Sequence, residues 1–107
     1  MIIPRMKENI TWSKTPFSGV EFFWLSEKTE NGRTAILKFE EHAELPLHHH
    51  PGWEQIYVLD GRLQINSEIY AANDFVLIGA RTDHSVLALE PSKYMTISQM
   101  EGVTVVE

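Results

Sequence analysis

The stretch EQIYVLDGRLQINSEIY, Glu54–Tyr70, sets a pattern that the rest of the chain repeats. Two short apolar runs flank Asp60-Gly61, a dipeptide frequent in tight turns because both of its positions tolerate positive φ. Within each run apolar and polar side chains alternate, as they do in a strand, where successive side chains face opposite ways. We therefore predict two strands joined by a tight turn.

Short apolar runs of the same kind lie before and after this stretch. The runs at residues 20–27 and 34–40 flank Asn31-Gly32 and predict another hairpin, and four more follow Tyr70: DFVLIGA, HSVLALE, YMTISQM and VTVVE. No segment keeps a helical period over three turns, and only PRMKENI near the N-terminus favours one short turn. About eight to ten short strands in a chain of this size predict an all-β sandwich or barrel.

Length and composition limit what the chain can be. A chain of 107 residues predicts one domain over residues 1–107, with a core over about residues 11–100. The absence of cysteine excludes disulfides, thiolate metal sites and cysteine nucleophiles. No run has the length of a signal peptide or of a membrane span, so we expect a cytoplasmic protein without a membrane partner. The formal net charge of −6 and the scattered basic residues argue against a nucleic-acid surface.

Three consecutive histidines interrupt this strand pattern at residues 48–50. Strand alternation directs His48 and His50 to one face and His49 to the other. Pro51-Gly52 supplies a turn that can bring the Glu54 carboxylate round to the same point.

A later histidine completes the candidate set. His84 begins another predicted strand, and a sandwich can fold it across to the first group. Three imidazoles and one carboxylate suit a divalent transition metal such as Fe, Mn, Ni, Cu or Zn. A metal that accepts five or six ligands would keep open positions for water or substrate.

Other polar and aromatic residues have weaker claims. A lone histidine on a strand is usually not a metal ligand, and this applies to His42 and His49. A carboxylate beside a turn, such as Glu54, can instead stay solvated or contact the ligand imidazoles without touching the metal. Trp53 is the one aromatic residue considered near a pocket entrance, whereas Phe22, Phe23 and Trp24 count as core or interface aromatics. Arg81 or Gln99 would anchor a polar group only if turned inward, and solvent-facing positions are favoured for both.

Alternation also predicts which side chains line the interior. If Glu54 and His84 point inward, their neighbours two and four residues on do so as well, and Lys38 pointing outward turns Leu37 and Phe39 in. The interior would then be mostly apolar and suited to a small, partly hydrophobic ligand. The predicted inward residues are Leu37, Phe39, Ile56, Val58, Val86 and Ala88.

These motifs resemble those of the cupin superfamily (RmlC-like), small β-barrels of jelly-roll type. His48, His50, Glu54 and Gly61 follow the first cupin motif, HxHxxxExxxxxxG, and NDFVLIGARTDH, residues 73–84, approximates the second, GDxxxxPxGxxH. The second motif departs from the pattern, since Asn73, Gly79 and Arg81 replace a glycine, a proline and a glycine. His42 likewise stands where the first motif usually opens with a glycine.

From about Thr11 to Met100 the chain resembles the cupin domain of the ChrR anti-sigma factor, a group that includes some small dioxygenases. TWSKTPFSGVEFFWLS and GRTAILKFEEHAELPLHHHPGWEQIYVLDG carry this likeness. The resemblance implies that His48, His50, Glu54 and His84 are metal ligands and that the protein forms a homodimer through strand edges and outward aromatics.

Three kinds of function stay open. An open metal site could serve an enzyme, such as a dioxygenase acting on a small chelating substrate or a Lewis-acid catalyst. It could equally serve a metal-dependent binding or sensing module, as the ChrR likeness implies. The third alternative is a metal-free barrel kept for oligomerisation. No general base, nucleophile or phosphate loop decides among them, and the fold does not either.

Overall fold

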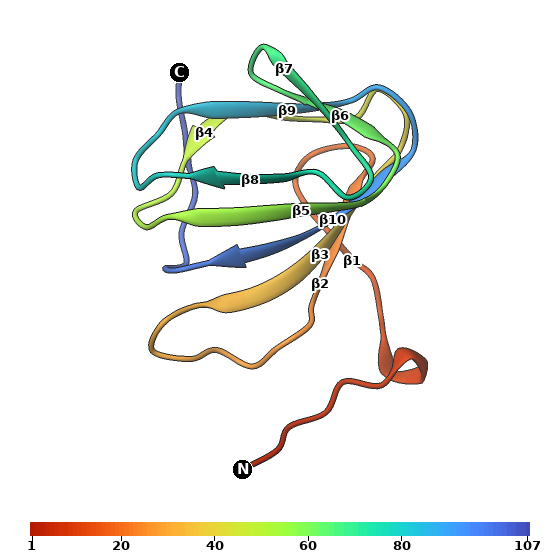
Figure 1. Cartoon of the computed structure of the whole chain (residues 1–107), viewed down its shortest axis with the longest axis vertical. Helices are drawn as coiled ribbons and strands as arrows, with labels where there is room; N and C mark the ends of the chain where they lie inside the picture. The colour runs from red at the N-terminus through yellow and green to blue at the C-terminus, as the bar shows by residue number, and fades with distance from the viewer.

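The computed structural model describes all residues from Met1 to Glu107 and contains eleven strands and one short 3-10 turn, η1 (Lys7–Asn9). The strands form two antiparallel sheets that pack face to face (Figure 1). The six-stranded sheet has the order β1 (Ser13–Lys14), β2 (Val20–Trp24), β3 (Arg33–Phe39), β10 (Ser92–Ser98), β5 (Glu54–Asp60) and β8 (Phe75–Ile78). The five-stranded sheet has the order β11 (Thr104–Val105), β4 (Glu44–His49), β9 (His84–Ala88), β6 (Arg62–Ile65) and β7 (Glu68–Ala71). The prediction of an all-β jelly-roll barrel is confirmed.

The core lies between the two sheets and comes from alternate residues of both. Because inward and outward side chains alternate along a strand, each inner face is apolar. The predicted inward residues Ile56, Val58, Val86 and Ala88 are fully buried, and Phe39 is nearly so. The main buried cluster consists of Val20, Phe39, Ala43, Leu45, Ile56, Val58, Leu63, Ile65, Ile78, Val86, Ala88 and Tyr94.

The turn at Asp60-Gly61 differs from its prediction. β5 and β6 belong to different sheets, so the chain crosses from one sheet to the other here and makes no hairpin. Gly61 has φ 84° and lies so close to Ser92 that a Cβ would overlap the serine side chain. Glycine is needed for this close backbone approach. The predicted β2–β3 hairpin is present, and a tight hairpin joins β6 to β7 through Asn66, whose φ is 53°.

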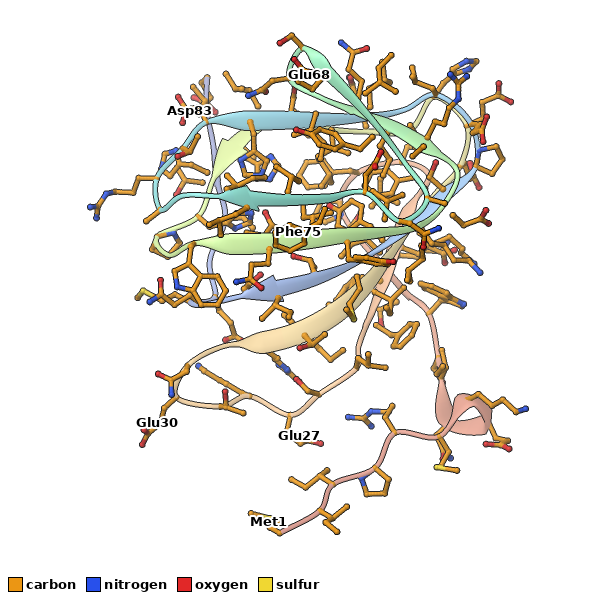
Figure 2. The ribbon with its side chains drawn as sticks, in the orientation of Figure 1. Met1, Glu27, Glu30, Glu68, Phe75 and Asp83 are labelled. Atoms are coloured by element: carbon orange, nitrogen blue, oxygen red, sulfur yellow. The ribbon has the colours of Figure 1, made fainter.

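The two ends of the chain behave differently. The N-terminal arm, with the predicted short turn at η1, extends away from the sheets (Figure 1), and Met1 lies at its far end (Figure 2). β11 instead pairs with the end of β4, opposite His48 and His49. This pairing lays residues 99–103, which we call the C-terminal strap, beside the end of the barrel that holds the histidines. No helix has the length and hydropathy to cross a membrane.

Candidate metal centre

Three strand termini and one turn bring the predicted ligand residues to one end of the barrel, at the left of Figure 1. His48 lies near the end of β4, Glu54 begins β5 and His84 begins β9. His48 and His84 are partners in the β4–β9 ladder, which fixes their spacing. His50 follows β4 directly and turns back toward them.

The three histidines are close enough to share one ion, and Glu54 lies against two of them. One ring nitrogen from each of His48, His50 and His84 lies within 4.8 Å of the others. Oε1 of Glu54 lies 3.3 Å from Nε2 of His50 and 3.3 Å from Nε2 of His84. The structure thus brings together all four residues singled out from the sequence.

Backbone carbonyls orient each imidazole. Nδ1 of His48 lies 2.7 Å from the Pro46 carbonyl oxygen, and Nδ1 of His84 lies 2.9 Å from that of Thr82. Nδ1 of His50 lies 2.9 Å from the carbonyl oxygen of Gly102 in the C-terminal strap. Because a carbonyl oxygen can only accept, each Nδ1 carries the proton and donates it. The Nε2 lone pairs are therefore free to bind a cation.

Two buried atoms at the centre of the cluster have no hydrogen-bond partner, Oε1 of Glu54 and Nε2 of His84. Buried polar atoms are nearly always satisfied, so this pair needs an explanation. Both are acceptors in the tautomer just described, and they face each other at 3.3 Å. A divalent cation would satisfy both, and three nitrogen donors with one oxygen donor form a set that transition metals accept. The residues present fit a metal.

Electrostatics prepares Glu54 and His48 for a cation, whereas the raised pKa of His50 favours its protonated form. Burial alone would raise the pKa of Glu54, but its contacts with His50, His84 and Thr96 outweigh burial and hold the pKa of the carboxyl well below its usual range. Burial is the main reason that the pKa of His48 is lowered. For His50, burial opposes protonation, yet the contact with Glu54 outweighs it and raises the pKa. Glu54 is thus an anion and His48 a neutral imidazole at neutral pH.

A cavity of about 420 Å³ opens from this cluster between the two sheets. Aromatic and aliphatic side chains form most of its wall, and the C-terminal strap contributes one side. Its lining residues are Thr15, Phe17, Phe22, Trp24, Ala35, Leu37, Leu45, His48, His50, Glu54, Tyr94, Thr96, Ser98, Met100, Glu101, Gly102 and Val103. The expected mostly apolar pocket is present.

The structure also shows where the other residues considered for the pocket lie. Trp53 does not line this cavity, whereas Phe22 and Trp24, expected as core or interface aromatics, do. The backbone N–H of Trp53 donates instead to Oε1 of Gln99, and this contact holds the Gln99 side chain outside the cavity. Arg81 is exposed.

The remaining histidines lie outside the cluster. Nδ1 of His49 is 3.0 Å from Oδ1 of Asp83, on the opposite side of β4 from His48. Figure 2 shows Asp83 at the turn that precedes β9. His42 is exposed and lies 3.6 Å from a carboxylate oxygen of Glu41. Neither belongs to the candidate metal centre.

Sequence reasoning missed the polar side of the cavity. Tyr94, Thr96 and Ser98 alternate along β10 and all line the cavity, and Oγ1 of Thr96 donates to Oε2 of Glu54 over 2.6 Å. The signal is present in SKYMTISQM, where hydroxyl-bearing residues recur every second position. The sequence alone does not show which face of this strand turns inward, so the pattern could not be assigned to the cavity.

Comparison with known proteins places this geometry in context. Residues 5–102 match the family model described as the ChrR Cupin-like domain. No curated protein matches the sequence. Among solved structures, the polyketide cyclase RemF from Streptomyces resistomycificus superposes with a TM-score of 0.87 at 14% identity, covering 100% of this chain and 87% of that one.

Two further structures share the fold. The acetylacetone dioxygenase from Acinetobacter johnsonii has a TM-score of 0.82 at 13% identity, with 100% of this chain and 78% of that chain covered. The anti-sigma ChrR from Rhodobacter sphaeroides, solved in complex with SigE, has a TM-score of 0.75 at 22% identity. That match covers 88% of this chain and 51% of the ChrR chain. Identities this low establish a common fold and leave the activity open.

Proposed function

Because the chain belongs to the ChrR cupin-like domain family, we propose that it binds one divalent transition metal through His48, His50, Glu54 and His84. The observation that carries this proposal is the pair of buried atoms without partners, Oε1 of Glu54 and Nε2 of His84. The three Nδ1–carbonyl hydrogen bonds support it, because they leave every Nε2 free for coordination. Fe, Mn, Ni and Zn all suit this donor set.

We further propose a dioxygenase-type activity on a small chelating organic substrate. A redox-active metal would supply oxygen and Lewis-acid chemistry at the inner end of the cavity. The chain itself supplies a mostly apolar cavity of about 420 Å³, within the range usual for small-molecule sites, with aromatic walls at Phe22 and Trp24. The structural likeness to an acetylacetone dioxygenase is consistent with a small oxygen-rich substrate.

The second candidate is a non-enzymatic metal-dependent binding or sensing module. The likeness to ChrR favours it, because the match covers 88% of this chain and ChrR was solved in complex with SigE. In this case the same cavity would hold a ligand without converting it. The two candidate functions require the same metal site and differ in whether the bound molecule is converted to a product.

Elemental analysis of untagged protein purified without added metal tests the metal site. Iron at about one equivalent would favour oxygen chemistry, and zinc would favour binding or sensing. The matched variants are His84→Ala, which removes a central donor, and His42→Ala, which removes an exposed histidine remote from the cluster. Wild-type protein without metal, together with unchanged stability in His84→Ala, would overturn the proposal. Oxygen uptake by iron-loaded protein with small diketones then separates enzyme from binding module.

We also propose that residues 1–107 act as one domain that forms a homodimer. Phe75 and Leu77 on the edge strand β8 are 55% and 58% exposed, which is unusual for large apolar side chains on a sheet edge. Burial alternates along β8, where Phe75 and Leu77 are exposed and Ile78 is buried, so Phe75 (labelled in Figure 2) points away from the core. Light scattering should give twice the chain mass, and Leu77→Lys should give a monomer. A monomeric wild-type protein would contradict this proposal.

A further inference from the structure

The end of β10 forms the wall of the cavity beside Glu54. Ser98, the last residue of that strand, is the direct ladder partner of Glu54 and pairs with Arg33 on its other side. Side chains directly opposite each other in an antiparallel pair point to the same face, with their Cβ atoms about 4.5–5.5 Å apart. Ser98 accordingly lines the cavity together with Glu54. Its side chain therefore lies at the histidine end of the cavity.

The backbone fixes Ser98 in this position. The N–H of the next residue, Gln99, donates to the carbonyl oxygen of Trp53 over 3.0 Å, so the contact between β10 and the chain before Glu54 continues past Ser98. Because Ser98 is paired with a strand on each side, the direction of its Cα–Cβ bond is set by the sheet. Only rotation about that bond moves the hydroxyl, among three staggered positions.

The chain does not use the hydroxyl of Ser98. The hydroxyl of Thr96 donates to Glu54, and that of Thr15 donates to backbone carbonyls. Ser98 makes no side-chain hydrogen bond, the residue is half-buried, and its oxygen is not among the buried atoms without a partner, so the hydroxyl is accessible from the cavity. The remaining hydroxyl of the lining, that of Tyr94, belongs to a residue four positions or about 13 Å away along the strand.

The other side chains at this end have no proton to offer a ligand. The Nδ1–H groups of the three clustered histidines are committed to backbone carbonyls, which leaves the Nε2 atoms as acceptors. Glu54 is an anion and can only accept. A divalent cation held by three neutral imidazoles and one carboxylate keeps one positive charge, which favours an anionic ligand. Such a ligand is an acceptor, and Ser98 carries the free side-chain donor beside it.

We propose that the Ser98 hydroxyl donates a hydrogen bond to an anionic ligand that faces the histidine cluster. This inference rests on the proposed metal site and goes beyond it, because it names a residue that binds the ligand and the charge that the ligand carries. Thr96, two residues earlier on the same strand, bonds to Glu54, whereas Ser98 bonds to none of the candidate metal ligands. The two hydroxyls therefore have separable roles: Thr96 orients a metal ligand and Ser98 binds the anion.

The test uses the full-length protein loaded with cobalt(II), whose visible absorption bands respond to added ligands, and azide as the anionic probe. The dissociation constant of azide is measured by absorbance titration for wild type, for Ser98→Ala and for Ser98→Thr, which keeps a hydroxyl. The matched control is Ser85→Ala. Ser85 follows His84 directly on β9, so its side chain faces the opposite side of the sheet. Cobalt affinity is measured for each protein by chelator competition.

We expect the dissociation constant of azide to rise about tenfold in Ser98→Ala, as for the loss of one hydrogen bond to a charged acceptor. Ser98→Thr and Ser85→Ala should match wild type within about twofold, and cobalt affinity should be equal in all four proteins. An azide dissociation constant in Ser98→Ala within about twofold of wild type, or no azide binding by cobalt-loaded wild type, would overturn the inference. An equally large fall in cobalt affinity would overturn it as well, because Ser98 would then act on the metal ligands.

The inference and the proposed metal site fail in different ways. Wild-type protein that shows no cobalt absorption bands would refute the metal site, and the inference with it. Cobalt bands together with an azide affinity that does not depend on Ser98 would refute the inference alone and leave the metal site standing.

Discussion

Thr96 donates a hydrogen bond from Oγ1 to Oε2 of Glu54 over 2.6 Å, while Oε1 of the same carboxylate faces the histidines without a partner. The two oxygens of Glu54 thus have different roles. Strand β10, which carries no candidate metal ligand, fixes the rotation of a side chain that begins β5. Orientation of a ligand by an outer partner of this kind is a common feature of metal sites in proteins.

Replacing Thr96 by valine should weaken metal binding while leaving the core intact. Valine has nearly the same shape but cannot donate, so Glu54 loses the contact that orients it. Loss of such an outer partner typically costs about 10- to 100-fold in metal affinity. We expect zinc affinity, measured by competition with a fluorescent chelator, to fall at least about tenfold.

The matched control is Thr34→Val on β3. Thr34 pairs with Ile97 across the same strand β10 and makes no side-chain contact with the cluster. Equal zinc affinity in Thr96→Val and Thr34→Val would show that the hydrogen bond to Glu54 does not matter for coordination.

Gly102 connects the C-terminal strap to the metal centre. Its carbonyl oxygen accepts from Nδ1 of His50, and its φ of 119° lies in a region that side-chain-bearing residues rarely adopt. Gly102→Ala should therefore shift the backbone, at a cost of about 1–3 kcal/mol in unfolding free energy, and misalign His50. Zinc affinity should fall together with stability in a urea titration with and without zinc.

Gly79→Ala is the control for that variant. A Cβ at Gly79 would meet only Oγ1 of Thr82, at 3.5 Å, and its φ is not positive. If Gly102→Ala binds zinc as tightly as Gly79→Ala, the strap does not position His50.

Much of this centre was predictable because local rules govern it. Strand alternation separated His48 and His50 from His49, and the structure places His49 against Asp83 on the other side. The turn at Pro51-Gly52 does return Glu54 to the same point. Composition and strand spacing were enough for the fold class, since no other arrangement closes so many short strands over one core.

The features that the sequence did not predict depend on contacts between distant segments of the chain. Asp60-Gly61 has the local chemistry of a hairpin, but the chain changes sheets there, and the glycine packs against Ser92, thirty-one positions further on. Which face of β10 turns inward is set by the pairing of this strand with both β3 and β5. The local sequence pattern does not reveal whether Tyr94 or Gln99 will face the cavity. The carbonyl partner of His50 likewise comes from Gly102.

Adding zinc to metal-free protein should raise its melting temperature. A ligand at about 100 times its dissociation constant stabilises the native state by about 2.7 kcal/mol, equivalent to about 10 °C or more for a domain of this size. His50→Ala should abolish most of this rise, whereas His49→Ala should preserve it, because only His50 faces the cluster. Similar zinc-induced rises in the two neighbouring variants, measured by thermal unfolding, would refute the assignment of His50 as a ligand.

The buried side chain of Tyr94 should give the protein a distinctive alkaline behaviour. Burial raises the pKa of Tyr94 well above the ordinary value of 10.0, so above pH 10 the unfolded chain releases a proton that the folded chain keeps. The stabilising contribution of this group is complete below pH 10 and is lost as pH rises toward the folded-state pKa. As pH rises above 10, the free energy of unfolding should therefore fall less in Tyr94→Phe than in wild type.

Absorbance at 295 nm, which reports tyrosinate formation, measures this directly because the chain contains three tyrosines. In wild type, one of the three should ionise well above the others or only when the protein unfolds, and Tyr94→Phe should lack that late step. Tyr57→Phe should keep it, because Tyr57 is half-exposed and bonded to Asn73. A late step that persists in Tyr94→Phe, or an alkaline loss of stability in Tyr94→Phe equal to that of wild type, would mean that burial does not keep the Tyr94 phenol protonated.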